Sequence, residues 1–254
     1  MTLPNFDGKH DAEAVFRPGD LLPPPEERPE LPPALVLCYQ DHFFEHVVET
    51  YTDGEELTDV GGVSGRIYRV TDQVAVAGDF GIGSAVTAGL IDEKAALGVE
   101  TVCILGGAGC LDPSVPPEEA ILPTRAIRDD GASYHYLPPE APAEPTPALV
   151  DELARAIGDA TIPVHRGPTW TIEAFFRETV PEVEHYASEG VLTVEMEAAT
   201  LFAVAGALGM DAAAVFAIGD YVTATEREVP DASLDLLRDL FEPTVAALCE
   251  HVRT

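Results

Sequence analysis

Two carboxylates toward the C-terminal end, Glu197 and Asp220, each follow an apolar run. Glu197 stands between a short strand predicted to end at 192–194 and an almost wholly apolar helix predicted over 198–208. Asp220 follows a second buried strand, predicted over 212–218. Ligands of open α/β sheets bind at the carboxyl ends of the strands, so we expect both side chains to open into one crevice. A sugar held there would meet one carboxylate for its hydroxyls and a general acid for its leaving group.

The same residues also have structural explanations. Acidic side chains stabilise the positive N-terminus of a helix, so Glu197 could cap the helix that follows it. Asp220 could cap a turn, and Met196, between Glu195 and Glu197, could belong to the apolar core. Chemistry and structure both remain open as explanations of these residues.

Apolar runs and turn residues predict an alternating α/β domain after a proline-rich arm. The arm covers residues 1–33 and the domain covers 34–254. Strands are predicted at 34–39, 63–71, 73–79, 101–106, 120–127, 162–168, 191–195 and 212–218. Helices are predicted near 84–98, 147–158, 173–188, 197–209 and 232–252. A chain of 254 residues can bury one substantial core, and we find no signal of a second domain.

The acidic composition restricts the environment and the partners. The formal net charge is -31, and Lys9 and Lys94 are the only lysines. Molar salt shortens the Debye length to about 3 Å and would screen this charge, so we expect a halophile, with an archaeon as the favoured source. An acidic protein from an ordinary cell is the alternative. Such a surface argues against nucleic acid or an anionic membrane as partner.

The first residues of the chain and the length of its apolar stretch indicate the expected localisation. The chain begins with polar and acidic residues, unlike a signal peptide, and Asp211 interrupts the apolar stretch that follows Glu197. We therefore expect a cytoplasmic protein with no membrane span.

Five segments, taken in order, resemble the nucleoside phosphorylase and nucleosidase superfamily. They are G-D-F-G-I-G-S at 78–84, I-L-G-G-A-G-C-L-D at 104–112, A-I-R-D-D-G-A-S-Y-H-Y at 126–136, W-T-I-E-A-F-F-R-E-T at 170–179, and V-E-M-E-A-A at 194–199 with A-I-G-D downstream. The order is that of uridine-phosphorylase-like members, which share their fold with bacterial-type purine nucleoside phosphorylase. The resemblance covers about residues 34–252 and implies a single α/β domain, with three α/β/α layers and a central mixed twisted sheet. It also implies a homo-oligomer, either a dimer or a hexamer of dimers, and no cofactor or metal.

The resemblance gives each residue of the carboxylate segment a role. Glu197 would accept hydrogen bonds from the ribose 2′- and 3′-hydroxyls, Met196 would pack against the sugar, and Glu195 would support them without touching it. Asp220 matches the acid that protonates or hydrogen-bonds N7 of a leaving purine. Here Gly219 replaces the serine that usually precedes this acid, which removes a hydroxyl that could hold the carboxylate.

Candidates for contacting the base lie in the W-T-I-E segment and before it. The Gln-x-Arg pair by which uridine-type members hold a pyrimidine is absent from the matching segment. Thr171 and Glu173 are placed to face a base instead, with Arg177 as a charged partner. Glu173 could equally begin a surface helix. His135 could reach the same pocket, although a hydrogen-bonded core histidine is the alternative.

The phosphate site departs most from the phosphorylases. Gly106, Gly107, Ala108 and Gly109 keep a glycine-rich strand end whose amides could face an anion, with Gly83 as a further candidate. A tight turn is the alternative explanation of these glycines. The usual arginines and hydroxyl are replaced by Ile104, Gly107 and Phe43. Arg17 stands near where relatives place a histidine that reaches a neighbouring subunit, and it could rebuild the site with one of Arg66, Arg69, Arg125, Arg128 and Arg177.

Three functions follow from these observations. The first is phosphorolysis of a nucleoside to free base and ribose 1-phosphate, with inorganic phosphate as co-substrate. The second is hydrolysis, in which water replaces phosphate, as the missing phosphate contacts suggest. The third is nucleoside binding without catalysis.

Overall fold

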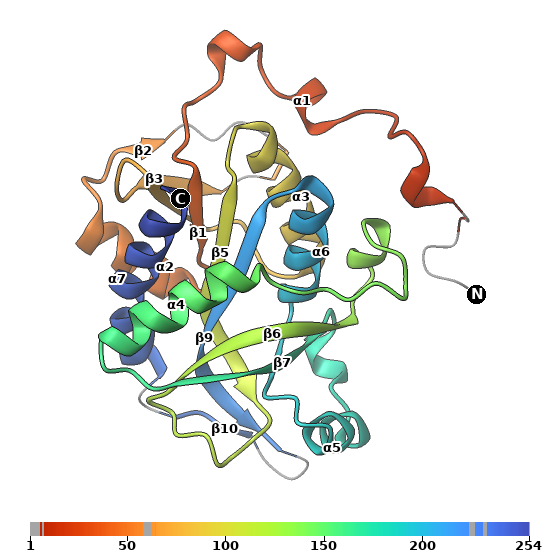
Figure 1. Ribbon diagram of the computed structural model, residues 1–254, viewed down its shortest axis with the longest axis vertical. Helices are drawn as coiled ribbons and strands as arrows, with labels where there is room; N and C mark the ends of the chain where they lie inside the picture. The colour runs from red at the N-terminus through yellow and green to blue at the C-terminus, as the bar shows by residue number, and fades with distance from the viewer. Residues whose placement is uncertain are drawn as a thin grey trace.

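The structure is a computed structural model that describes residues 6, 8–57, 62–63, 65–223, 227–230 and 233–253. Its strands are β1 (Ala34–Leu37), β2 (Glu56–Leu57), β3 (Arg66–Arg69), β4 (Val74–Gly78), β5 (Thr101–Cys110), β6 (Ala120–Asp129), β7 (Val164–Ile172), β8 (Thr193–Glu195), β9 (Asp211–Val222) and β10 (Arg227–Glu228) (Figure 1). Its α-helices are α1 (Pro18–Leu21), α2 (Asp41–Tyr51), α3 (Ser84–Ala96), α4 (Pro147–Asp159), α5 (Val180–Ser188), α6 (Ala198–Leu208) and α7 (Ser233–His251). Short 3-10 helices lie at Lys9–Asp11, Pro25–Glu27, Ser133–His135 and Phe175–Arg177.

The strands form one mixed sheet, as predicted. β1 lies parallel between β4 and β5, and β3 and β2 continue the sheet in antiparallel order beyond β4. β5 also runs parallel to β9 along most of its length. A second path leads from β9 through β6, β7 and β8 back to β5. The strand pairings therefore close into a ring of five strands at one end of the sheet, a feature that the sequence analysis did not predict.

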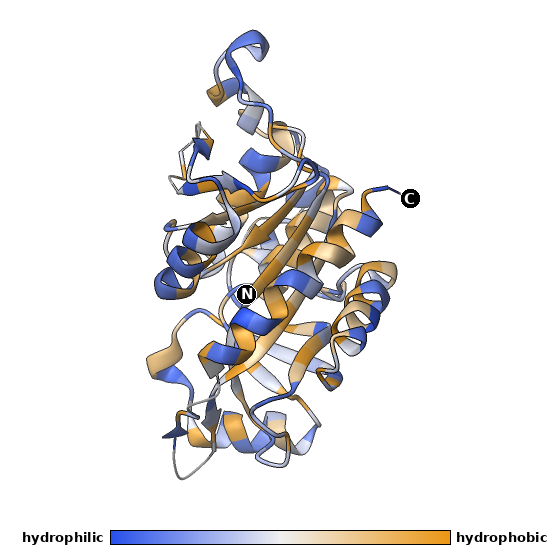
Figure 2. Cartoon of the chain, turned by 90° about the vertical axis from the view of Figure 1, so that its left-hand side faces the viewer, coloured by the Kyte–Doolittle hydropathy of each residue, from blue (hydrophilic) through white to orange (hydrophobic). Residues whose placement is uncertain are grey.

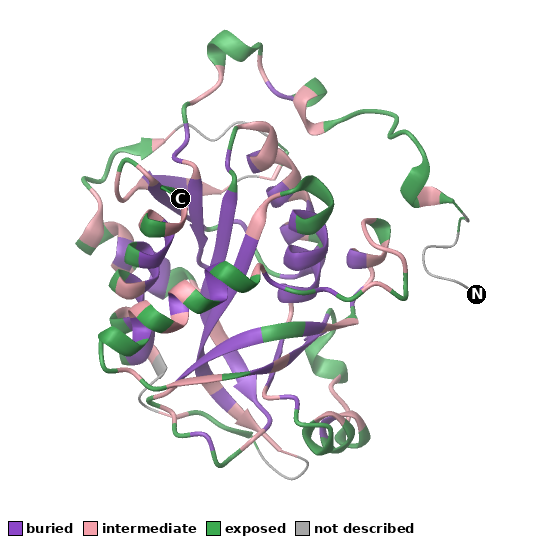
Figure 3. Cartoon of the chain, in the orientation of Figure 1, coloured by how far each residue is buried: buried purple, intermediate pink, exposed green. Residues whose placement is uncertain are grey.

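Helices cover both faces of the sheet, which gives the predicted three layers. Successive side chains of a strand point to opposite faces, so Leu35 and Val36 of β1 belong to different core clusters. The cluster with Leu35 includes side chains of α3 and α6, and the cluster with Val36 includes side chains of α2, α4 and α7. Apolar strands accordingly lie between two helix layers (Figure 2). Exposed polar residues form the outer faces of α2, α4 and α7, whereas α6 is buried over most of its length (Figure 3).

Several elements differ from their predicted bounds. The strands predicted at 101–106 and 212–218 extend to Cys110 and Val222, so the site residues belong to the strands themselves. The helix predicted over 173–188 begins only at Val180, because Thr179 and Glu182 form a capping box there. α2 was not predicted.

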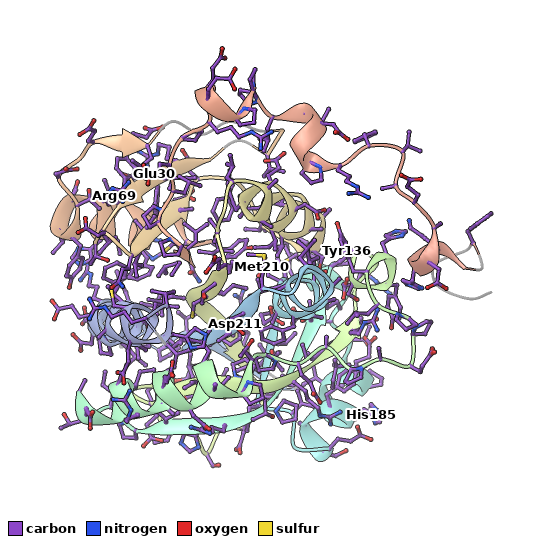
Figure 4. The ribbon with its side chains drawn as sticks, turned by 45° about the horizontal axis from the view of Figure 1, so that its top comes forward. Glu30, Arg69, Tyr136, His185, Met210 and Asp211 are labelled. Carbon is purple, nitrogen blue, oxygen red and sulfur yellow. The ribbon has the colours of Figure 1, made fainter. Side chains whose placement is uncertain are left out.

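The periphery of the domain has two notable features. Residues 8–33 of the arm run over the outside of the domain before β1 begins at Ala34 (Figure 1). Asp211 lies next to Met210 at the start of β9 (Figure 4). Its carboxylate hydrogen-bonds His251. His251 also bonds Glu152, so one histidine joins β9, α7 and α4. No helix in the described part of the chain combines the length and apolarity needed to cross a membrane.

Candidate active site

A pocket of about 340 Å³ opens where β5 and β9 reach their carboxyl ends. Gly107, Ala108 and Gly109 of β5 line it beside Gly219 and Asp220 of β9. The two strands run parallel with Gly109 opposite Asp220, and a register shift lies just before this pair. The location agrees with the crevice expected from the sequence, because both strands deliver their last residues to the same edge.

One edge of β5 is open at this pocket. β5 pairs with β1 as far as Ile104 and with β8 from Gly109 onward. Between these points, no described strand pairs with that edge. Residues 106–109 continue the strand rather than forming the tight turn that the glycines could also have indicated. Backbone groups on an unpaired strand edge are available to a ligand.

Gln40 fills the space above the glycines, and the sequence analysis missed it. A Cβ on Gly107 would lie 2.8 Å from Gln40 Nε2, and a Cβ on Gly106 would lie 3.1 Å from Gln40 Oε1. Gln40 lines the pocket and its Oε1 is buried without a hydrogen-bond partner among the described atoms. It directly precedes α2, which contains the fully buried Phe43. The signal for Gln40 would have been the helix start that we did not predict.

Glu195 is held by the beginning of α6 and by β7. Its Oε2 accepts hydrogen bonds from the backbone N–H of Glu197 at 2.7 Å and of Ala198 at 2.6 Å. Its Oε1 accepts one from the hydroxyl of Thr171 at 2.5 Å. Burial raises the pKa of Glu195, and these hydrogen bonds oppose the rise. Glu195 thus caps the helix, the role that the sequence left open for Glu197.

Glu197 is a buried carboxyl group beside Met196. It is 8% exposed, and its Oε1 accepts a hydrogen bond of 2.7 Å from the N–H of Gly83. Burial, and then the negative charge of Glu195, raise the pKa of Glu197 to about 8. Met196 lines the pocket, and its carbonyl accepts a bond of 3.0 Å from Ser84 Oγ. Glu197 itself is next to the lining residues rather than among them.

Gly83, an expected phosphate contact, donates its backbone N–H to the carboxylate of Glu197 instead. Its φ of 93° lies in a region that side chains rarely allow, and this conformation accompanies the N–H donation to the Glu197 carboxylate. With its N–H engaged there, Gly83 does not line the pocket.

Asp220 belongs to a charged group at the other side of the pocket. Its carboxylate accepts a hydrogen bond and forms an ion pair with Arg227 of β10. Glu178 lines the same pocket, and burial, followed by the charge of Asp220, raises its pKa while Arg227 opposes the rise. Neither Glu178 nor Arg227 was predicted from the sequence. Glu178 lies five residues beyond Glu173 in the segment that was expected to face the base.

The expected base contacts of that segment lie elsewhere. Thr171 is fully buried, and its hydroxyl accepts from the N–H of Ala199 while it donates to Glu195. Glu173 and Arg177 are exposed and do not line the pocket. The 3-10 helix Phe175–Arg177 instead leaves Phe175 and Phe176 at the pocket wall.

Two further candidates belong to contacts of the arm. His135 is exposed, and its Nδ1 lies 2.6 Å from Lys9 Nζ. Burial and the charge of Lys9 lower the pKa of His135. Arg17 is exposed next to α1, where its backbone N–H donates to Asp20 at 2.7 Å. Neither residue lines the pocket of its own chain.

The described residues contain no group of three or more His, Cys, Asp and Glu side chains that could hold a metal ion.

Comparison with known proteins gives one family. A family profile described as the phosphorylase superfamily matches residues 34–252. A guanosine phosphorylase from Halorubrum lacusprofundi is 31% identical over 156 residues, which cover 61% of this chain and 65% of the relative. A uridine phosphorylase from Escherichia coli is 33% identical over 170 residues, which cover 60% of this chain and 65% of the relative. A DeoD-type purine nucleoside phosphorylase from Tolumonas auensis is 25% identical over 251 residues, 95% of this chain and 96% of the relative. The chain thus spans less than two thirds of the length of the first two relatives.

Proposed function

Because this chain belongs to the phosphorylase superfamily, we propose that it is a pentosyltransferase that cleaves a nucleoside by phosphorolysis, giving a free base and ribose 1-phosphate. Inorganic phosphate is the co-substrate, and the reaction requires no cofactor. The observation that carries the proposal is the single pocket at which Met196, Asp220 and the open edge of β5 meet. A nucleoside could be held there by the carboxyl groups and phosphate by the backbone of the open strand edge.

The reaction develops positive charge on the sugar, because cleavage of an N-glycosidic bond passes through an oxocarbenium-like state. Glu197, when ionised, accepts hydrogen bonds from the ribose 2′- and 3′-hydroxyls and stabilises that charge. Glu195 holds the backbone N–H of Glu197 and so positions it, and Met196 packs against the sugar. The assignment of the sugar to this side of the pocket is supported by Met196, which lines the pocket directly beside the buried carboxyl group of Glu197.

The base leaves with a negative charge that the enzyme must disperse. Asp220 lines the pocket with Arg227 hydrogen-bonded to it. In its protonated form Asp220 assists the departure of a purine by giving its proton, or donating a hydrogen bond, to N7, and Arg227 orients the side chain.

Phosphate meets the open edge of β5. The backbone of Gly106 to Gly109 and the side-chain amide of Gln40 provide neutral hydrogen-bond groups there. The enzyme acts as a homo-oligomer in which the exposed Arg17 of one copy supplies a cation to another. It works in the cytoplasm of a salt-adapted cell, in agreement with its net charge of -31.

Hydrolysis is the second candidate function. It is favoured by the charged residues that line the pocket, because Glu178, Glu195 and Asp220 are three acidic residues and Arg227 is the one arginine among the described lining residues. Three carboxylates oppose the binding of a phosphate dianion but not of water.

Product analysis separates the two functions. A panel of nucleosides is incubated at high and constant salt, with and without phosphate, and the sugar products are separated by chromatography. Phosphorolysis gives ribose 1-phosphate at a rate that saturates with phosphate. Free ribose, formed at a rate indifferent to phosphate, would establish the hydrolase instead.

A further inference from the structure

Three charged side chains and two aromatic rings share one part of the pocket wall. Glu178 and Asp220 provide carboxylates, and Arg227 provides a guanidinium bonded to Asp220. The ring centroids of Phe175 and Phe176 are 4.0 Å apart, and the rings are 44% and 87% exposed. The rings offer apolar surface to the face of a planar ligand, and the charged groups offer both acceptors and donors to its edge.

Glu178 lacks a strong local stabiliser of its charge. Burial and the nearby charge of Asp220 both raise its pKa, and only Arg227 opposes them. A ligand N–H that donates to Glu178 would compensate the desolvated carboxylate, because a hydrogen bond to the charged form favours that form. A ligand lone pair at the same point would be repelled.

We propose that Glu178, with Arg227 beside it, selects bases whose edge pairs an N–H donor with a carbonyl oxygen, and so favours guanine and hypoxanthine over adenine. The inference rests on the proposed cleavage of nucleosides and names the substrate class of the same site. Glu178 accepts from N1–H of the oxopurine, and Arg227 donates to its carbonyl oxygen.

The chemistry of the edges makes the selection. Guanine and hypoxanthine carry N1–H next to a carbonyl group, and guanine adds a 2-amino donor for the second oxygen of Glu178. Adenine carries an N1 lone pair next to an amino group, so an ionised carboxylate meets a lone pair and a guanidinium meets an N–H. Sites built around a hydrogen bond reject analogues that lack its partner, because the polar groups of the site are then unpaired.

The test compares guanosine, inosine and adenosine as substrates of the wild-type enzyme, Glu178→Gln and Glu173→Gln. Glu173 is the matched control, an exposed carboxylate of the same segment that does not line the pocket. In the wild type, kcat/KM should favour guanosine over adenosine by about tenfold or more, given the partial exposure of the pocket. Glu178→Gln should lower this ratio by about tenfold, because an amide can turn its donor toward N1 of adenine. Glu173→Gln should leave the ratio unchanged.

Equilibrium binding makes the test independent of turnover and of any variant. The wild-type protein is titrated with hypoxanthine and with adenine. Tighter binding of hypoxanthine supports the inference even where no nucleoside is cleaved, in which case the proposed function alone fails. Equal or tighter binding of adenine overturns the inference, as does a guanosine preference that is unchanged in a folded Glu178→Gln enzyme.

Discussion

Glu197 should make catalysis depend on pH in a range where few carboxyl groups titrate. Its pKa is raised to about 8 by burial and by Glu195, so about a tenth of the free enzyme carries the carboxylate at pH 7 and about nine tenths at pH 9. If only the ionised form accepts both ribose hydroxyls, kcat/KM should rise about tenfold over this interval, because this parameter reports the free enzyme. Glu197→Gln keeps an oxygen for the N–H of Gly83 and removes the charge. At pH 9 the variant should be about 10²-fold to 10³-fold slower than the wild type, the typical cost of a lost preorganised contact. At pH 7 this ratio of wild-type to variant rates should be about tenfold smaller.

The assay measures initial rates from pH 6.5 to 9 at saturating phosphate and with nucleoside far below its KM. Oxopurines and phosphate also titrate in part of this range. Since they do so identically with both enzymes, the ratio of wild-type to variant rates isolates Glu197. A ratio that stays constant between pH 7 and pH 9, with both proteins folded, would refute the role of the ionised carboxylate. A 2′-deoxynucleoside should be a poorer substrate of the wild type, and this difference should shrink in the variant.

Three further changes test other parts of the structure. Asp220→Asn should slow cleavage of inosine more than that of uridine, because protonation matters most for a poor leaving group; equal losses would show that Asp220 only holds the pocket together. Gly107→Ala brings a Cβ to 2.8 Å from Gln40 Nε2 and should displace that amide, raising the KM for phosphate several-fold with a smaller effect on the KM for nucleoside. In His251, burial lowers the pKa, but the hydrogen bonds with Asp211 and Glu152 outweigh burial, so the folded pKa is raised. That stabilisation is complete below the unfolded pKa of about 6.5 and is lost as pH rises through the folded value, so His251→Gln should lower the free energy of unfolding more at pH 6 than at pH 9, as measured by denaturant titration.

The elements that sequence could predict are those whose burial pattern is local. Both faces of β1, β4, β5 and the first part of β9 are covered, and continuous apolar runs indicate such strands. The ring of five strands is different, because β6 and β9 join through a single residue pair, Ile121 and Phe216, far apart in the chain. The start of α5 was readable from its capping box, Thr179 and Glu182, but the apolar residues before it suggested a longer helix.

In the candidate site, too, some residues could be predicted from local sequence and others depend on long-range structure. Strand-end positions predicted Glu197 and Asp220 at one crevice; in the structure Asp220 and Met196 line the pocket, whereas Glu195, predicted to support from outside, lines it in place of Glu197. Glu178 could not be chosen over Glu173 from spacing alone, because the 3-10 helix between them decides which carboxylate reaches the pocket. Gln40 lies on an edge of β5 that opens only because β1 ends and β8 begins at different points along it. Such a gap is a property of sheet register, which no local pattern records.

The acidity of the chain and the chemistry of its pocket are connected. Molar salt reduces the Debye length to about 3 Å, so it screens the repulsion between phosphate and a protein of net charge -31 at long range. Groups in direct contact are closer than this length and are screened far less. For the proposed phosphorolysis, phosphate would therefore need donors at hydrogen-bond distance, and the open edge of β5 and the amide of Gln40 are the neutral candidates. Such a donor set would fit the resemblance, in which Ile104 and Phe43 stand where phosphorylases place arginines, because in concentrated salt attraction from a distance contributes little and contact geometry decides the binding.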